Sequence, residues 1–489
     1  MPENQDPKTD EKRINTYSQH IPKVIINPLH QKLLLLAVAI GMLLDGLDGS
    51  IVNIILPQIS KSFNTDIGTV SWVVITYFLM MAGLILVFGK FAERGFIKRI
   101  FLGGVLIFTL GSAACGISPV FGILLASRLF QGIGAAMIAA TSPLLCVTYL
   151  PKNMLGMAFG TILMASSIGV AAGPATGGFL AHYLSWHWVF LINIPIGLLV
   201  LPFAMHVIPN DIPRIKQPFD LTGAGVFFGM IASGVYALER IPHFGITDPR
   251  ILLCTAFCFV CLIVFLVREL RCTNPLLNVR IFTVWKFTAV CLAFLITIIV
   301  LMGIFYLLPF FLQVGMKFDT AVSGLYLLIP PTITAIIGIP LGRWSDRIGR
   351  RPFAIVSCLV LIAINCIYLV ILPEMGIVPL IAGLILMGLL WGFAGGPVAS
   401  RVVDYSPTGE EGTGSSLMIT SSYLGCVIGT ALFATAFTLT TAVDGMPSFA
   451  ELNPDIFMNG FHFSMLIGLV LSVVAFLFSV IVREKRADT

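Results

Sequence analysis

The stretch Leu43-Leu-Asp45-Gly-Leu-Asp48-Gly-Ser-Ile-Val-Asn53-Ile-Ile-Leu-Pro57 lies inside the first long apolar segment of the chain. Residues three apart on a helix are neighbours on one face, so the sequence places the carboxyl groups of Asp45 and Asp48 side by side. An ionised carboxyl group near the centre of a bilayer costs roughly 2.5–3.5 kcal/mol even on the lenient insertion scales. Because two such groups facing lipid would be hard to tolerate, we expect both to face a polar cavity.

The composition is that of a membrane protein. Of 489 residues, 57% are hydrophobic and only 11% charged, against about 25% charged in a soluble domain. A transmembrane helix needs about 20 apolar residues. The sequence therefore predicts an all-helical integral membrane protein with fourteen spans, at residues 33–56, 70–90, 99–118, 120–149, 156–182, 188–208, 221–239, 251–268, 287–313, 322–342, 353–371, 377–400, 415–440 and 461–482.

The positions of the basic residues test this count, because lysine and arginine gather in cytosolic loops. With a cytosolic N-terminus, 24 of the 29 basic residues fall on the inner side and four on the outer side, and Arg128 lies within a span. We therefore expect a multi-pass protein of the plasma (inner) membrane with both termini cytosolic. The net charge of +5 comes from these short loops, so no nucleic-acid partner is predicted.

Two basic turns resemble each other, one beginning at Gly89 and the other at Gly342. Each follows the second helix of a six-helix unit if the seventh and eighth spans are set aside, which is typical of parallel repeats. The predicted organisation is two six-helix bundles with a central two-helix insert. Its segments are a disordered cytosolic tail (1–32), the first bundle (33–208), the insert with its loops (209–286), the second bundle (287–482) and a cytosolic tail (483–489).

Several motifs together resemble the major facilitator superfamily, and within it the fourteen-helix drug:proton antiporter branch, of multidrug efflux type. The resemblance covers both halves of the chain. It rests on the helix-one motif Leu47–Pro57, the helix-four motif Arg128–Ala136, the helix-five glycines from Gly160 to Gly178, Trp186–Gly197, Tyr306–Gln313, and the loop motif Gly342–Arg351. Glu93 stands where the family has Asp, Gly95 and Phe96 are in reversed order, His187 replaces Arg, and Asp45 is an additional acid.

The acidic stretch and Arg128 are the predicted proton-coupling residues. Asp48 and Arg128 lie at similar depths, and each is the natural partner of the other because an unpaired charge is costly in the membrane. The pair either switches during transport or is a static ion pair that only orients helices. Asp45 lies nearer the midplane, and we expect it to titrate together with Asp48. The alternative for Asp45 is a solvated acid without a coupling role.

Other candidate residues fall into three groups. Small residues four apart allow close helix packing, and a proline permits a bend, which predicts a packing or hinge face at Gly169, Gly173, Pro174, Gly177 and Gly178. An acid in a basic turn predicts a cytosolic gating loop at Gly89, Glu93, Arg94, Gly342, Asp346, Arg347, Gly349, Arg350 and Arg351. Sparse polar groups among apolar ones suit a hydrophobic solute, and the predicted substrate-cavity residues are Asp45, Asn53, Gln131, Tyr306, Gln313 and Tyr326.

The predicted function is proton-coupled export of hydrophobic, cationic compounds by alternating access. The expected partners are a small-molecule substrate, protons and the lipid bilayer, and the protein is expected to be a monomer. No Gly-x4-Gly-Lys-Ser/Thr loop occurs in the sequence, so no nucleotide or other cofactor is expected and the energy source is the proton gradient. No metal site or enzymatic site is predicted. The alternatives are proton-coupled transport of a specific metabolite, siderophore or lipid, uptake rather than export, and a transporter-like receptor.

Overall fold

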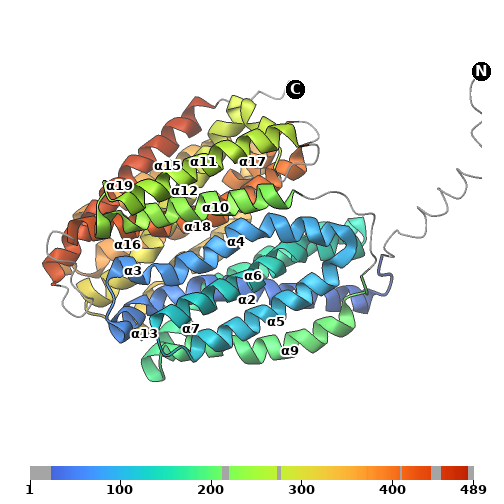
Figure 1. The fold of residues 1–489 in the computed structure, drawn as a ribbon, viewed down its shortest axis with the longest axis horizontal. Coiled ribbons are helices and arrows are strands. Elements are labelled where there is room, and N and C mark those ends of the chain that lie inside the picture. Colours follow the sequence, from blue (N-terminus) through green and yellow to red (C-terminus); the bar gives the residue numbers. More distant parts are fainter. Residues whose placement is uncertain are drawn as a thin grey trace, which may run out of the picture.

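The computed structural model describes residues 24–211, 220–272, 277–371, 373–407, 410–441 and 453–482, and helices joined by short turns make up these segments (Figure 1). Within these described ranges, thirteen helical segments are long and apolar enough to cross a membrane. One of them, Ile67–Gly116, has 50 residues, about 75 Å at 1.5 Å per residue, which is two crossings of a bilayer. It turns at Gly95, whose φ of 96° is a left-handed conformation that suits glycine. The predicted count of fourteen is therefore confirmed.

The helices of the first half pack mainly against one another. They are α2 (Pro28–Phe63), α3 (Ile67–Val70), α4 (Trp72–Phe91), α5 (Ile97–Gly116), α6 (Phe121–Tyr149), α7 (Leu155–Tyr183), α8 (His187–Leu191) and α9 (Asn193–Val207).

The second half forms a separate group beside the first (Figure 1). Its helices are α12 (Trp285–Phe310), α13 (Thr320–Tyr326), α14 (Ile329–Ile348), α15 (Arg351–Val370), α16 (Ile377–Phe393), α17 (Ala399–Asp404), α18 (Glu411–Thr441) and α19 (Pro454–Ile481).

The insert is a helical hairpin of α10 (Leu221–Phe244) and α11 (Pro249–Arg271). Helix α10 packs against α4 of the first half and α18 of the second (Figure 1). The ring of Phe228 fills the space over Gly83 of α4, and Thr435 of α18 donates a 3.0 Å hydrogen bond to the Leu238 carbonyl oxygen. The insert therefore touches both halves where they meet.

Helix ends differ from the apolar runs that predicted them. Helix α2 begins at Pro28, where the Asn27 side chain accepts from the Leu29 amide, and it continues to Phe63. A side-chain cap and a proline at the first position start a helix whether or not the residues are apolar. Part of the expected tail is thus ordered, and the amide of Ile25 donates to the Tyr149 carbonyl oxygen at 2.9 Å. Residues 1–23 of the predicted disordered tail and the predicted cytosolic tail 483–489 lie outside the described residues.

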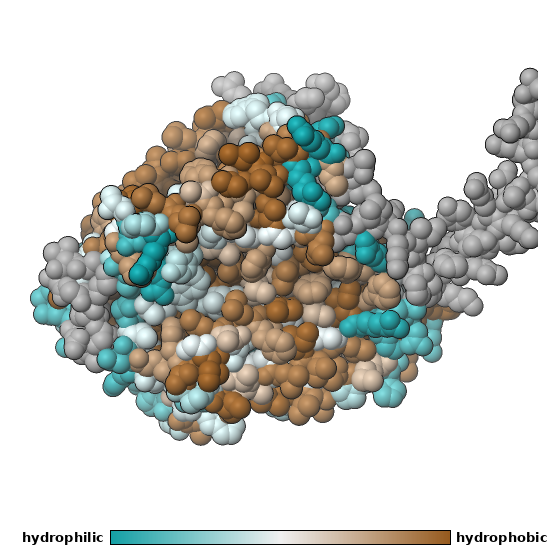
Figure 2. All heavy atoms as spheres, viewed as in Figure 1, coloured by the Kyte–Doolittle hydropathy of each residue, from teal (hydrophilic) through white to brown (hydrophobic). Residues whose placement is uncertain are grey.

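The surface agrees with a protein that spans a membrane. A broad band of apolar side chains crosses the molecule and separates hydrophilic groups at its two ends (Figure 2). The outer helix of the insert contributes strongly to exposed apolar surface, with Leu253 72% and Phe259 60% exposed. Exposed side chains of this kind suit contact with lipid.

Candidate functional site

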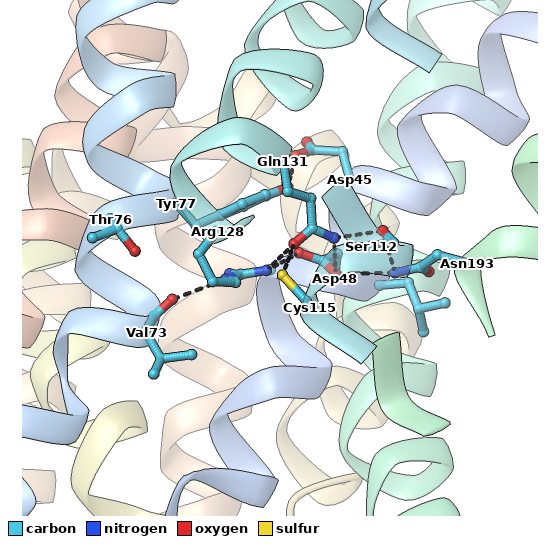
Figure 3. Close-up of polar contacts among 12 residues, drawn as sticks. Asp45, Asp48, Val73, Thr76, Tyr77, Ser112, Cys115, Arg128, Gln131 and Asn193 are labelled. Carbon is cyan, nitrogen blue, oxygen red and sulfur yellow. Dashed lines mark hydrogen bonds and ion pairs between the residues drawn. The ribbon is translucent and has the colours of Figure 1, made fainter. Parts of the chain in front are cut away.

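Asp48 lies at the centre of a buried polar network formed by helices of the first half (Figure 3). Its carboxylate accepts hydrogen bonds from Arg128 at 2.6 Å, from Gln131 at 2.7 Å and from Asn193 at 3.0 Å. Asp48 is 0% exposed and Arg128 1% exposed. The structure thus brings together the two charges whose pairing the sequence suggested, and it satisfies the carboxylate on both oxygens.

Arg128 is fixed by further contacts. Its Nε donates to the Val73 carbonyl oxygen at 2.9 Å, and its guanidinium lies 4.2 Å from the centre of the Tyr77 ring. Gln131 links the pair to α5 through a 2.7 Å hydrogen bond to the Ser112 hydroxyl. A buried ion pair is tolerated when its remaining donors and acceptors are satisfied. This network ties α2, α4, α5, α6 and α9 together.

Asp45 lies one turn earlier on α2 and has different surroundings. It is 7% exposed, and it accepts hydrogen bonds from the hydroxyls of Tyr77 at 3.1 Å and Tyr423 at 3.4 Å. Tyr77 belongs to α4 of the first half and Tyr423 to α18 of the second. Within the described residues no basic side chain forms an ion pair with Asp45. This carboxyl therefore joins the two halves through neutral donors.

Small residues of α7 let α2, which carries both acids, pack close to the α7 backbone. A Cβ on Gly169 would stand 2.5 Å from the Leu43 carbonyl oxygen, and one on Gly173 would overlap the Ser50 hydroxyl. Gly177 faces Ile51 and Ile54 of α2 in the same way. At these three positions α7 thus lies close against the acidic stretch of α2. A hinge role for this face stays a prediction.

Gly178 and Pro174 contact the second half instead. A Cβ on Gly178 would stand 2.5 Å from the Thr320 carbonyl oxygen, and the Pro174 carbonyl oxygen lies against Gly324 of α13. On the same side, Gln58 donates to the Thr320 hydroxyl at 2.7 Å. The two halves therefore touch tightly at the end of the molecule remote from the basic turns.

Toward the basic turns, α7 and α14 are more open. Glycines there have no other described heavy atom within 4 Å of where a Cβ would stand, namely Gly156 and Gly160 on α7 and Gly338 and Gly342 on α14. Apolar side chains on both helices are exposed, with Leu163 67% and Ile336 66% exposed. Helix α7 is thus packed closely against α13 at one end and lies only loosely beside α14 at the other.

The predicted cavity residues do not gather around Asp45. Gln131 belongs to the Asp48 network, and Asn53 donates to the Gly49 carbonyl oxygen at 3.3 Å. Tyr306 donates to the Ile67 carbonyl oxygen and Gln313 to that of Ile54 at 2.9 Å, so both tie the second half to the first. Tyr326 stacks on Phe318 with 5.3 Å between ring centres. Their role toward a substrate stays a prediction.

The first predicted gating loop holds an exposed ion pair. Lys90 and Glu93 are 3.3 Å apart, and the Arg94 guanidinium lies 5.3 Å from the centre of the Phe91 ring. The reversed order of Gly95 and Phe96 has a structural counterpart, because it is Gly95 that takes the left-handed conformation. Gly89 has open space around it.

The second loop is more strongly tied. Arg350 lies 3.5 Å from Asp346 and also pairs with Asp404 at the end of α17. Arg351 donates to the Val480 carbonyl oxygen at 2.8 Å, and Gly349 has a φ of 94°. The loop therefore connects α14 to α17 and α19 within the second half, and Arg347 lies in the last turn of α14.

Sequence reasoning missed Tyr77, Ser112 and Asp404 as site residues. Tyr77 offered a signal, since a tyrosine in the middle of a long apolar span needs a partner for its hydroxyl. Ser112 offered none, because a serine in a span commonly bonds its own helix. Asp404 lies more than fifty residues from Arg350, and nothing local links the two.

Comparison with known proteins identifies the class. The chain matches the Major Facilitator Superfamily model over residues 38–430, and it belongs to that superfamily. It is 29% identical to the multidrug resistance protein Stp of Mycobacterium tuberculosis, over 87% of this chain and 79% of that protein. It is 32% identical to the putative multidrug resistance protein MdtD of Pectobacterium carotovorum, over 68% and 71%. It is also 28% identical to the riboflavin transporter RibZ of Clostridioides difficile, over 83% and 88%.

Solved structures agree on the fold. A bacterial homologue of the human lysosomal transporter Spinster, in an inward-facing and unoccupied conformation, matches with a TM-score of 0.65 at 15% identity, over 93% of this chain and 97% of that one. The peptide transporter POT matches with a TM-score of 0.67 at 14% identity, over 91% and 93%. The protein is a multi-pass membrane transporter of small molecules and not an enzyme, and the predicted resemblance to the superfamily is confirmed.

Proposed function

We propose that the protein exports hydrophobic, cationic compounds across the plasma membrane in exchange for protons, with both termini and the basic turns in the cytosol. The observation that carries the proposal is the setting of Asp45, an almost buried carboxyl without a basic partner among the described residues, held by one tyrosine from each half. The similarity to proteins named for multidrug resistance supports the export of such compounds.

The chemistry of Asp45 gives the coupling. An ionised carboxylate can accept from both Tyr77 and Tyr423, which ties α4 to α18. A protonated carboxyl carries an O–H donor on one oxygen, and that oxygen accepts a hydrogen bond more weakly than a carboxylate oxygen does. The longer bond, from Tyr423, is the one we expect to break. Protonation would thus loosen the contact between the halves, and a cation bound at the same carboxylate would compete with the proton.

Asp48 has a different part in this scheme. Its two oxygens are occupied by donors from Arg128, Gln131 and Asn193, and it is fully buried. We assign it to holding the first half together and to maintaining the orientation of α2. Asp45, three residues earlier and 7% exposed, is then the carboxyl that exchanges its proton.

A flux assay tests the proposal. The full chain is reconstituted into liposomes, a pH difference is imposed, and uptake of ethidium, a hydrophobic aromatic cation, is followed by fluorescence. Antiport predicts that an acidic lumen drives ethidium inward in either orientation of the protein, and protein-free liposomes give the passive background. Asp45→Asn should abolish the driven component, whereas Asp455→Asn, a matched change at an exposed acid in the first turn of α19, should preserve it.

Two results would refute the proposal. Ethidium accumulation only with an alkaline lumen would indicate symport, and tight binding without flux would indicate a receptor. The similarity to RibZ makes riboflavin the second compound to test in the same liposomes. Riboflavin flux without ethidium flux would replace drug export by transport of a specific metabolite.

A further inference from the structure

A second group of ionisable side chains lies far from Asp45, where the insert meets the first half. We call it the α10 cluster; it consists of Asp66 in the turn between α2 and α3, and of Glu239, Arg240 and His243 near the end of α10. His243 lies 3.6 Å from Asp66, and Arg240 lies 3.1 Å from Glu239. Neither the transport site nor any motif of the sequence accounts for these residues.

Glu239 is the unusual member of the cluster. It is 1% exposed, and neither of its carboxylate oxygens accepts a hydrogen bond of normal geometry from the described part of the chain. Both ring nitrogens of His243 are also buried without such a bond within the described residues. A buried carboxylate that has one basic neighbour but accepts no hydrogen bond of normal geometry is costly unless it takes up a proton. The geometry therefore leaves acceptor sites that a proton would satisfy.

The charges of the cluster lead to the same conclusion. Burial would raise the pKa of Asp66, but the facing His243 imidazole and the hydroxyl and amide of Thr69 lower that pKa to about 2. Asp66 thus stays ionised at neutral pH. With Asp66 and Glu239 negative, Arg240 positive and His243 neutral, the buried group has one uncompensated negative charge, and one bound proton cancels it.

Among the described residues, no further ion pair joins the cluster to the neighbouring helices. Tyr306 of α12 faces the cluster, and its hydroxyl is committed to the Ile67 carbonyl oxygen. The Trp72 side chain of α4 interacts with Glu239, but its indole is neutral and supplies no counter-charge. On α18, the titratable side chains with described positions are Tyr423, which is bonded to Asp45, and Cys426.

Other charged groups of the packed helices have partners elsewhere, among them Asp220 and Arg268, which pair at the opposite ends of α10 and α11. On α4, Lys90 pairs with Glu93 at the opposite end of the helix. On α11, Asp248 caps the helix start, and the Arg250 guanidinium lies over the Phe244 ring. The unbonded atoms of Glu239 and His243 are thus the sites that the cluster itself offers to a proton.

We propose that the α10 cluster binds one proton, shared between Glu239 and His243, and that this proton holds the insert helix α10 against the first half. The site is separate from the transport carboxyl Asp45. It makes the docking of the insert respond to the pH at the end of the molecule remote from the basic turns. Asp66 fixes the imidazole from the first half, and Glu239 and His243 present the proton-binding atoms from the insert.

The first test is the melting temperature of the full chain, purified in detergent without substrate, between about pH 5.5 and about pH 8.5, the range in which histidine and buried carboxyls change charge. Asp45→Asn is the parent, so that the transport site contributes no titration. A proton bound on folding stabilises at low pH and is lost as pH rises. Glu239→Gln needs no proton to reach neutrality. Its melting temperature relative to the parent should therefore rise steadily with pH.

A second variant guards against a folding defect in the first. His243→Gln keeps the negative charge uncompensated, so its melting temperature should lie furthest below the parent at low pH, where the parent holds its proton. His462→Gln is the control, because His462 contacts the Ile371 carbonyl oxygen and lies outside the cluster; its difference from the parent should not vary with pH in this way. Differences for Glu239→Gln and His243→Gln that are both independent of pH would overturn the proton site.

Hydrogen exchange tests the docking itself. At one alkaline pH, amides of residues 228–244 should exchange more slowly in Glu239→Gln than in the parent, because the neutral amide replaces the missing proton. Equal exchange would overturn the link between the proton and the insert. Neither measurement needs a substrate or a gradient, so their outcome does not depend on the proposed export activity.

Discussion

Replacing Arg128 by Met would strand the Asp48 carboxylate in a fully buried site, with only the Gln131 and Asn193 amides left as donors. Removing one partner of a buried ion pair costs about 3–5 kcal/mol. The stranded acid can limit this cost by taking up a proton. For a carboxylic acid of ordinary pKa near 3.9, holding a proton at pH 7 costs about 4 kcal/mol, at 1.36 kcal/mol for each pH unit.

A double variant isolates that charge effect. Arg128→Met and Arg128→Met/Asp48→Asn both lose the hydrogen bond to Val73 and the contact with the Tyr77 ring, but only the single variant keeps an acid. The single variant should therefore be less stable than the double variant by about 4 kcal/mol at pH 7 and by about 1.5 kcal/mol at pH 5. The difference grows with pH because the folded single variant holds a proton that its unfolded chain releases.

Denaturant unfolding in mild detergent, followed by tryptophan fluorescence, measures this difference at the two pH values. Arg401→Met is the matched control. Arg401 is equally buried, at 1% exposed, but it donates to the Val482 carbonyl oxygen and has no carboxylate partner among the described residues. Its penalty should show no such growth with pH. Equal stability of the single and double Arg128 variants, or a gap that is the same at pH 5 and pH 7, would refute the electrostatic reasoning.

Three further predictions concern packing and the contact between halves. Gly169→Ala should lower the free energy of unfolding by about 1–3 kcal/mol, because its Cβ would meet the α2 backbone, whereas Gly160→Ala, in open space on the same helix, should raise it by up to about 1 kcal/mol. Gly349→Ala should lower the free energy of unfolding by about 1–3 kcal/mol through strain at its positive φ, whereas Gly342→Ala should not. Thermal unfolding of the four glycine variants measures these effects. Equal effects of the two variants within either pair would contradict the cause given for that pair. Tyr423→Phe removes the bond from the second half to Asp45 and should shift the pH dependence of ethidium flux with little change in melting temperature; an unaltered pH profile would exclude that bond from coupling.

The positions of the spans could be predicted because the bilayer imposes an apolar length on each helix, whatever its partners. The ends of the helices could not be predicted in this way, because they depend on capping residues and on the turns that connect the helices. Glu239 is the clearest case. The apolar run predicted a span ending there, with Arg240 outside the membrane, but α10 continues to Phe244. The carboxyl group is therefore buried between helices.

Within the candidate site, the sequence predicted the contact that follows from the energetic cost of an unpaired charge in the membrane. It did not predict contacts between residues far apart along the chain. Asp48 and Arg128 are two charges in apolar spans, and each requires the other. The contact of Asp45 with Tyr423 joins residues 378 positions apart, and no local pattern connects them. The alternative of a static ion pair for Asp48 and Arg128, left open by the sequence, is favoured by the hydrogen bonds that both groups make to further residues.

The position of α10 across the contact between α4 and α18 has a consequence for how the protein meets its solvent. Helix α10 covers the contact between α4 and α18, with the Phe228 ring over Gly83 and a hydrogen bond from Thr435 to Leu238. It would therefore keep acyl chains away from this contact. The insert does not cover the contact between α7 and α14, where Gly160 and Gly338 have open space beside them. A solute dissolved in the bilayer would therefore meet two unlike contacts between the halves, one covered by an extra helix and one that α10 and α11 leave uncovered.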